Sequence, residues 1–326
     1  MDSQDKILHL LQDGKYHSAN SISNKLDIHQ SVVEQYLGKL DSFGVLTSAY
    51  KTNDLKLSEN LDLLSPEIIT NYLSDNSHAL CCEIRVFQSL DSTNKYAREQ
   101  AEARSNSGLV VLAEQQTAGR GRRGKRWVSP FASNIYMSIV WDFFKGAESI
   151  QGLSLAIGLG VRRALMELDI QDVKLKWPND IFVNGKKLGG ILVEIIGDPR
   201  GACTVIVGIG INVSMPESMG QEIDQDWIDI SQISGVFISR DQLSAKIIRN
   251  IFEVLKDFDD VGFSSYLSEW QRADFLKNKT CTINMSNDSK SGTVLGVDNS
   301  GALRVKLLSG EEKIFLGGEI SVRINK

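Results

Sequence analysis

Hydrophobic residues recur every three or four positions near the start of the chain, and this spacing predicts short amphipathic helices. The stretches DKILHLLQDG (5–14), SANSISNKLD (18–27) and HQSVVEQYLGKLDSFG (29–44) carry Leu, Ile and Val at that interval. Gly14 and Gly44 stand where helices commonly end, because glycine readily adopts the left-handed conformation of a helix C-terminus. The sequence therefore predicts three short helices in this region.

Three helices in this arrangement are typical of a helix-turn-helix. Ser18 is a candidate N-cap of the second helix. The helix from about Gln30 to Phe43 would enter the major groove of DNA, and residues 46–57 would form a reduced wing. The residues of that helix that we expect to face DNA are Gln30, Ser31, Gln35 and Lys39.

The charge of this region leaves an alternative open. Residues 1–63 hold six lysines, no arginine and nine acidic residues, which gives a net charge of −3. A module that neutralises phosphates normally concentrates Lys and Arg on one face. The wing sequence LTSAYKTNDLKLS also lacks a glycine-rich turn. A small three-helix unit that does not bind DNA therefore remains a second interpretation.

After residue 64 the pattern becomes a mixture of strands and helices. Pro66 marks the change, since proline fits the first turn of a helix and PEIITNYL would begin one. Runs rich in Val and Ile, often bounded by Gly or Asn, predict strands in CEIRVF, GLVVLAE, NIYMSIVW, VKLKW, GGILVEII and CTVIVGIGINV. Helical spacing occurs at residues 94–104, 150–168 and 240–258. These elements predict an α+β domain.

The last fifty residues carry a different pattern. TCTINM, SGTVLGVD, ALRVKLL and EKIFLG are short strands separated by Asn, Asp, Ser and Gly turns, with no helix between them. A small β-barrel or sandwich is expected here. The complete α+β multidomain chain would then consist of three domains, with boundaries at residues 1–64, 65–272 and 273–326.

Composition narrows the class of protein. The chain has 326 residues, of which 42% are hydrophobic and 24% charged, as in ordinary globular proteins. It has no run of about 18 to 20 apolar residues that could cross a membrane, and its acidic start MDSQDKILHLL is unlike a signal peptide, so we expect a cytoplasmic protein. The four cysteines lack paired spacing and are expected to be reduced. A net charge of −5 argues against a surface devoted to nucleic acid.

The stretch AGRGRRGKRW (118–127) is the most informative for chemistry. Its glycines let the backbone approach an anion, and its guanidiniums can form charge-assisted bonds to phosphate or carboxylate. The order of residues does not match a Walker A loop or a dinucleotide-binding fingerprint. An RG-rich nucleic-acid segment is disfavoured, because the block is single and lies between two strands. The block predicts a site for a polyanionic ligand.

Two further blocks are ambiguous when taken alone. KLKWPND (174–180) brings Lys176 close to Asp180, which could be a surface ion pair, and Lys187 follows in GKKLGG. DSTN (91–94) could simply cap a helix. Its hydroxyl and amide groups are equally suited to a neutral ring that resembles urea.

Together the blocks carry a resemblance. DSTN, GRGRRG, KWPND, KKLGGILVE and GIGIN occur in the order and spacing of the bacterial biotin protein ligases that double as repressors of the biotin operon, and the chain is similar to that family over nearly its full length. RWVSPFASNIYMSI and GGEISVR fit the same family. The resemblance implies an N-terminal winged helix-turn-helix, a central class II synthetase-like catalytic domain and a C-terminal SH3-like β-barrel.

The resemblance also implies a two-step reaction. The biotin carboxylate would attack the α-phosphate of Mg²⁺-ATP to give biotinoyl-5'-AMP, and a lysine of the biotin carboxyl carrier protein of acetyl-CoA carboxylase would then take the biotin. Fixed cations are expected to stabilise the negative charge that develops in both steps. Family members form homodimers whose adenylate-bound form binds the operator DNA of biotin biosynthesis genes. The basic loop is expected to order around its anion.

The family's motifs assign the biotin-binding residues of this chain, and the charge and place of Lys176, Asp180, Trp127, Trp227 and Arg323 suggest further roles. The residues expected to bind biotin are Ser92, Thr93, Asn94, Gln116, Arg120, Gly121, Arg122 and Lys187. The catalytic set is Lys176, Lys187, Asp180 and Arg122, with Asp180 also a candidate for orienting Mg²⁺ or the incoming lysine. The residues expected to hold the adenylate are Arg123, Trp127, Asn179, Asn212, Trp227 and Arg323.

Two rival functions remain to be tested. A biotin-sensing transcription factor without transfer activity is disfavoured by the presence of Lys176, Asp180 and Lys187. A mono-functional ligase, whose N-terminal domain does not repress, agrees with every pattern described. A lipoate ligase has a related reaction, but GRGRRG together with KWPND favours biotin.

Overall fold

The chain divides into two compact units. The first comprises residues 1–63 with 130–132, and the second comprises residues 64–129 with 133–326. The computed structural model describes residues 3–49, 54–58, 61–73, 75–104, 106–146, 149–197, 201–285, 288–317 and 320–324.

The first unit contains the three predicted helices and a short hairpin. Its elements are α1 (Ser3–Leu11), α2 (Ala19–Leu26), α3 (Gln30–Ser42), β1 (Leu46–Ser48) and β2 (Leu55–Leu57). Ser18 caps α2 as predicted, since its hydroxyl oxygen accepts a hydrogen bond from the Ser21 backbone N–H at 3.1 Å. The strands pair antiparallel in the region expected for the wing, whose residues 50–53 lie outside the described residues. Apolar side chains from all three helices form one core.

The second unit is built on a seven-stranded sheet. Its strands are β3 (Glu83–Phe87), β4 (Leu109–Ala113), β5 (Ile135–Phe143), β6 (Lys174–Lys176), β7 (Asp180–Val183), β8 (Lys186–Gly197) and β9 (Cys203–Ile211). The spatial order is β3-β4-β5-β9-β8-β7-β6, and only the β3–β4 pair is parallel. The predicted strands are confirmed, and β7 is an addition that the sequence did not suggest.

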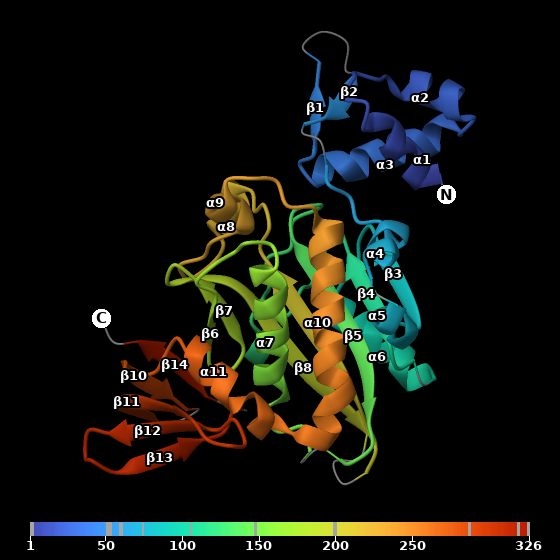
Figure 1. Ribbon diagram of the computed structural model, residues 1–326. Helices are drawn as coiled ribbons and strands as arrows, with labels where there is room; N and C mark the ends of the chain where they lie inside the picture. Colours follow the sequence, from blue (N-terminus) through green and yellow to red (C-terminus); the bar gives the residue numbers. More distant parts are fainter. Residues whose placement is uncertain are drawn as a thin grey trace. The chain divides into compact units, whose positions relative to one another are not determined.

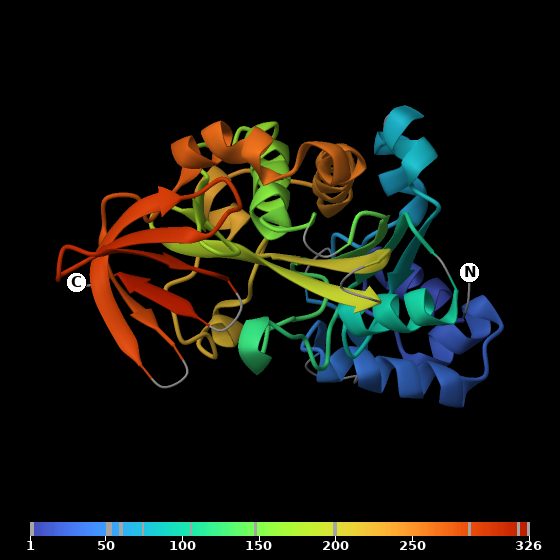
Figure 2. The ribbon, with the colours of Figure 1, turned by 90° about the horizontal axis from the view of Figure 1, so that it is seen from below.

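Helices cover both faces of this sheet. The helices of this unit are α4 (Pro66–Tyr72), α5 (Asp75–Leu80), α6 (Thr93–Ala103), α7 (Leu153–Met166), α8 (Glu217–Gly220), α9 (Ile230–Ser234), α10 (Arg240–Val261) and α11 (Leu267–Ala273), with 3₁₀ turns η1 (Arg122–Gly124) and η2 (Phe263–Tyr266). Figures 1 and 2 show α7 and α10 on one face and α6 on the other.

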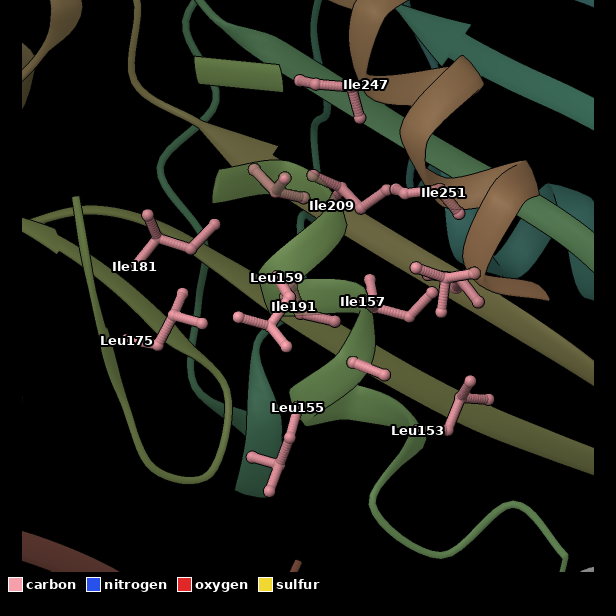
Figure 3. Close-up of a cluster of buried hydrophobic side chains, with 14 of the residues drawn as sticks. Leu153, Leu155, Ile157, Leu159, Leu175, Ile181, Ile191, Ile209, Ile247 and Ile251 are labelled. Atoms are coloured by element: carbon pink, nitrogen blue, oxygen red, sulfur yellow. The ribbon is translucent and has the colours of Figure 1, made fainter. Parts of the chain in front are cut away.

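The alternation of residues in β4 explains this layering. Val110 and Leu112 belong to the large core beneath α7 and α10, whereas Leu109 and Val111 belong to the smaller core beneath α6. In the large core, leucine and isoleucine side chains of α7 and α10 meet those of the sheet strands (Figure 3). The sheet is therefore buried on both sides, which fixes the positions of the strands that carry the site.

A five-stranded antiparallel sheet ends the chain. It consists of β10 (Thr280–Asn284), β11 (Ser289–Val297), β12 (Leu303–Leu307), β13 (Glu312–Phe315) and β14 (Ser321–Ile324) in the order β13-β12-β11-β10-β14. Its β11–β12 turn contacts the β6–β7 turn of the larger sheet, where the Trp177 indole N–H donates to the Gly301 carbonyl at 2.9 Å. Phe275, in the segment that leads from α11 to β10, stacks on Phe182 of β7. In the described part of the chain, no helix is long and apolar enough to span a membrane.

Candidate active site

A cavity of about 250 Å³ in the second unit gathers side chains from segments that are distant in sequence. The start of α6, the loop before β5, the β6–β7 hairpin, the middle of β8 and β9, and β14 all contribute to its lining. The candidate residues that line it are Ser92, Thr93, Asn94, Gln116, Arg120, Gly121, Arg122, Arg123, Trp127, Lys176, Asn179, Asp180, Lys187 and Arg323. The blocks singled out in the sequence thus meet around one space.

One wall of the cavity is polar and uncharged. Ser92, Thr93 and Asn94 are only 4%, 3% and 4% exposed. The Thr93 backbone N–H donates to Gln116 Oε1 at 2.9 Å, and Asn94 Nδ2 donates to Glu194 Oε2 at 2.7 Å. Ser92 occupies the N-cap position of α6 but makes no capping hydrogen bond with its side chain. Helix capping by its side chain therefore does not explain why a serine occupies this position.

Ser138 and Gly208 support this wall from the strands behind it. Ser138 Oγ lies 2.8 Å from Thr93 Oγ1 and 2.6 Å from Asn94 Oδ1. A Cβ atom added at Gly208 would lie 2.2 Å from Asn94 Oδ1, so the close approach requires glycine. The sequence assigned no role to either residue, although Gly208 begins the motif GIGIN and Ser138 is a serine inside the apolar strand NIYMSIVW.

The glycine- and arginine-rich loop forms a cationic wall. Arg123 and Gly124 have positive φ values of 57° and 71°, which turn the chain back on itself. Arg122 Nη1 donates to Asn179 Oδ1 at 3.1 Å, and its Nη2 donates to the Gly317 carbonyl. Burial lowers the pKa of Arg122, an effect that the nearby Asp180 carboxylate opposes. A partly desolvated guanidinium of this kind binds anions strongly.

Two lysines and a carboxylate form the third wall. Lys187 Nζ lies 2.7 Å from Asp180 Oδ1 and 5.5 Å from the centre of the Trp127 ring. Lys176 is directly opposite Asp180 in the β6–β7 register, and its Nζ lies 5.1 Å from the centre of the Phe182 ring. Burial lowers the pKa of Lys176; Asp180 opposes this change and Lys187 reinforces it. The lysines are therefore held close together beside one acid.

Gly210 in β9 makes room for the Trp127 ring, and Gly190 in β8 lies beside it. A Cβ atom at Gly210 would lie 2.5 Å from Trp127 Cε2, and one at Gly190 would lie 3.6 Å from Trp127 Cζ3. The Trp127 indole N–H is buried and has no hydrogen-bond partner among the described residues. The ring therefore packs against β9 at Gly210 with an unused donor.

Two candidates lie outside the cavity lining. Asn212 is buried, and its Nδ2 donates to the Ile228 carbonyl at 3.1 Å. Trp227 donates to the Gly220 carbonyl at 3.1 Å and pairs as a parallel bridge with Lys187. The structure thus gives both residues contacts that shape the segment beside Lys187.

The candidate DNA-facing residues lie on α3 in the first unit. Gln30, Ser31 and Gln35 are exposed and Lys39 is half-buried, while Val33 on the opposite side of the helix is buried. Gln30 Nε2 donates to Glu34 Oε1 at 2.7 Å. The exposed side of α3 is polar but mixed in charge.

The arrangement suits a ligand with a neutral polar end and an anionic end. Buried hydroxyls and amides can satisfy the neutral end, and the arginines and lysines can stabilise charge at the other. Among the described residues, no three His, Cys, Asp or Glu side chains gather as a resident metal ion would require.

Comparisons with known proteins agree with this chemistry. Residues 86–212 match the biotin/lipoate A/B protein ligase family, and residues 278–323 match the biotin protein ligase C-terminal domain. The chain is 33% identical to the bifunctional ligase/repressor BirA of Escherichia coli over 98% of this chain and 96% of that protein, and 28% identical to BirA of Bacillus subtilis over 91% of each.

A solved structure extends the comparison to the fold. The biotin protein ligase of Aquifex aeolicus, in complex with biotin and ATP, aligns with a TM-score of 0.64 at 27% identity and covers 74% of this chain and 99% of that one. Both family models match, and a relative of 33% identity aligns with almost the whole chain. The chain belongs to the biotin protein ligase family.

Proposed function

We propose that the protein activates biotin with ATP as biotinoyl-5'-AMP and transfers the biotin to a lysine of the biotin carboxyl carrier protein of acetyl-CoA carboxylase. The observation that carries the proposal is the meeting of a buried neutral wall and a cationic loop around one cavity. The names of the relatives support it, since those of Paracoccus denitrificans and Mycobacterium tuberculosis are biotin–[acetyl-CoA-carboxylase] ligases.

Biotin would enter with its ureido ring against the neutral wall. Ser92, Thr93, Asn94 and Gln116 offer hydroxyl and amide groups for its urea N–H and carbonyl groups. Three of these side chains are buried, so a ligand that displaced their present hydrogen bonds without replacing them would cost about 1–3 kcal/mol per group. The wall would therefore select biotin over a ligand with an apolar head.

The reacting anions would lie against the cationic wall. A biotin carboxylate oxygen attacks the α-phosphorus of ATP, the bond to the bridging oxygen breaks, and pyrophosphate leaves. Arg120, the Gly121 backbone and Arg122 would hold the carboxylate and phosphate, while Lys187 and Lys176 would stabilise the growing charge. Lys187 would exchange part of its contact with Asp180 for one with the phosphate.

Mg²⁺ would enter as part of the nucleotide substrate. Asp180 is the one carboxylate in the described lining of the cavity, and Mg²⁺ typically binds one or two carboxylates together with substrate phosphates. The residues therefore fit an ion brought by ATP. The adenylate would be held by Arg123, Trp127, Asn179 and Arg323, with Asn212 and Trp227 shaping the neighbouring segment.

In the second step, the amine of the acceptor lysine attacks the acyl carbon and AMP leaves. The attacking amine must be neutral and must lose a proton as the amide forms. Asp180 lies 2.7 Å from Lys187 at the cavity and would orient this amine. The product is biotin in amide linkage to the carrier protein.

A transfer assay tests the ligase function directly. The full chain, biotin, Mg²⁺-ATP and the unmodified carrier domain should give a carrier heavier by one biotin in a mass spectrum, with release of AMP. Lipoate in place of biotin should give no product. Product with lipoate alone would contradict the proposal, and no product with either would reject the ligase function.

We also infer a domain organisation and a second function. Residues 1–64 would form a winged helix-turn-helix, residues 65–272 a class II synthetase-like catalytic domain and residues 273–326 an SH3-like barrel. The polar face of α3 and the relatives named ligase/repressor support repression of biotin biosynthesis genes by a homodimer that carries the adenylate. The two-fold symmetry of a dimer would match a palindromic operator.

A gel-shift experiment distinguishes this regulator from a mono-functional ligase. The protein should shift a DNA fragment from its own biotin-gene promoter only when biotin and ATP are both present, at a stated salt concentration. Gln35→Ala should weaken the shift without changing biotin transfer. A protein that transfers biotin but never shifts the fragment would be a ligase without a repressor function.

A further inference from the structure

Two segments of opposite charge meet at the edge of the cavity. The basic loop, defined as residues 120–126, has five Lys and Arg residues, and the acidic segment, defined as residues 217–226, has four Asp and Glu residues and no base. They are joined by an ion pair in which Arg126 Nη1 lies 2.9 Å from Glu222 Oε2. Opposite charges thus hold together two segments that are far apart in the chain.

Each segment is also connected to Lys187. On one side, Arg126 precedes Trp127, whose ring centre lies 5.5 Å from Lys187 Nζ. On the other side, the Asp226 carbonyl at the end of the acidic segment accepts a hydrogen bond from the Lys187 backbone N–H at 3.0 Å. The Arg126–Glu222 ion pair therefore links the segment that contacts the Lys187 side chain to the segment that binds the Lys187 backbone.

We propose that Arg126 and Glu222 are positioning residues, whose ion pair fastens the basic loop to the acidic segment and retains the adenylate in the cavity. This inference rests on the proposed function, because it concerns release of biotinoyl-AMP. Neither residue needs to touch the reacting atoms. Both act through Trp127 and the backbone that holds Lys187.

The exposure of the pair determines the size of its effect. The Arg126 and Glu222 side chains are 68% and 44% exposed, so water and salt screen their attraction. An exposed pair of this kind changes a rate by roughly twofold to fivefold. A weak ion pair suits this position, because the basic loop and the acidic segment must later separate to admit the acceptor lysine. The effect should appear in the release rate, since tight complexes are usually tuned by dissociation.

Charge replacement and exchange test the pair. We expect Arg126→Gln and Glu222→Gln each to release bound biotinoyl-AMP about two to five times faster, and the double variant to release it no faster than either one. Arg126→Glu combined with Glu222→Arg should restore slow release. The matched control is Arg98→Gln, which breaks the 2.9 Å pair with Glu102 on α6 at a similar exposure of 42% and 50%. This control should leave release unchanged.

Hydrogen–deuterium exchange of the ligand-free protein provides a second readout that does not depend on catalysis. Glu222→Gln should increase exchange in residues 119–127, where it changes no residue, and Arg126→Gln should increase it in residues 217–227. A wild-type protein that forms no biotinoyl-AMP would reject the proposed function, while exchange would still test the pair. Additive effects on release, or exchange that changes only in the mutated segment, would overturn the inference.

Discussion

Gly208 shows how a single missing side chain shapes the neutral wall. Its backbone lies so close to Asn94 that a methyl group would overlap the amide. We predict that Gly208→Ala displaces Asn94 and weakens biotin binding by about 1–3 kcal/mol, which is roughly 5- to 150-fold in Kd. Isothermal titration with biotin measures the change. Gly38→Ala, at a position with open space around it, should leave biotin affinity unchanged.

The buried Lys176 should impose a pH dependence on adenylate formation. Its pKa is lowered by burial, so its ammonium loses the proton at a lower pH than an ordinary lysine, whose pKa is about 10.4. If the cation is needed, activity falls as pH rises through that lowered pKa. Lys176→Arg should move the fall to higher pH because the guanidinium stays charged.

Pyrophosphate release measured from pH 6 to 10.5 checks this prediction. Lys176→Met should lower the rate at neutral pH by about 100-fold, the usual cost of removing one fixed donor to a developing charge. If the rate of Lys176→Arg falls at the same pH as the rate of the wild type, the group that titrates is not Lys176.

At the scale of elements, the start of α10 holds several segments together. Arg240 is only 2% exposed, and its Nη2 donates to Glu114 Oε2 at 2.8 Å and to the Asn134 carbonyl at 2.9 Å. The other Glu114 oxygen accepts from the Leu64 backbone N–H at 2.6 Å. The pair therefore joins α10, β4, the start of β5 and the first residue of the second unit.

Removing one partner should leave a buried charge uncompensated. We predict that Glu114→Gln lowers the free energy of unfolding by about 3–5 kcal/mol. Arg240→Met combined with Glu114→Leu should lose less, because no unpaired charge remains. Urea denaturation followed by tryptophan fluorescence measures both. Lys145→Gln, which breaks an exposed pair with Asp260, should stay within about 1 kcal/mol of wild type.

Most elements could be predicted from the sequence because their hydrophobic periods are long and their ends are marked. Ser18 and Ser65 cap helices as their type and position suggest. The strand β7 was missed because IFV is too short to give a period, although the Asn184-Gly185 turn after it, with both φ values positive, is a recognisable hairpin signal.

The residues of the site also fall into those that the sequence could predict and those that it could not. Residues within sequence motifs could be identified from their chemistry and spacing, and those such as Ser92, Arg122 and Lys187 meet at the cavity. The supporting roles of Ser138 and Glu194 could not be identified, although both residues lie within quoted stretches, because they act through contacts with Asn94 that only the packing of distant strands creates. Candidate ligand-binding groups can be identified from residue type and spacing. The side chains that hold those groups in place depend on tertiary contacts, which the sequence does not reveal.

At the scale of the whole molecule, the first unit is completed by a segment from far along the chain. Phe131 is 3% exposed and lies in the core of the first unit, where its ring stacks on Phe43 with centroids 4.7 Å apart and planes 17° apart. Residues 130–132 therefore belong to the same folded body as residues 1–63. A chain ending at residue 63 would lack part of its core.

We predict that Phe131→Ala destabilises the first unit by about 3–5 kcal/mol, the usual cost of removing a buried phenylalanine. Because all five tryptophans lie outside residues 1–63, hydrogen–deuterium exchange of α1 and α3 is the suitable measurement. Phe43→Ala should cost less because that ring is only partly buried. A double-mutant cycle should show a coupling of about 0.5–1.5 kcal/mol from the stacked rings. Independent effects of the two substitutions would mean that the segment only covers the first unit, whereas coupling would make Phe131 part of its core.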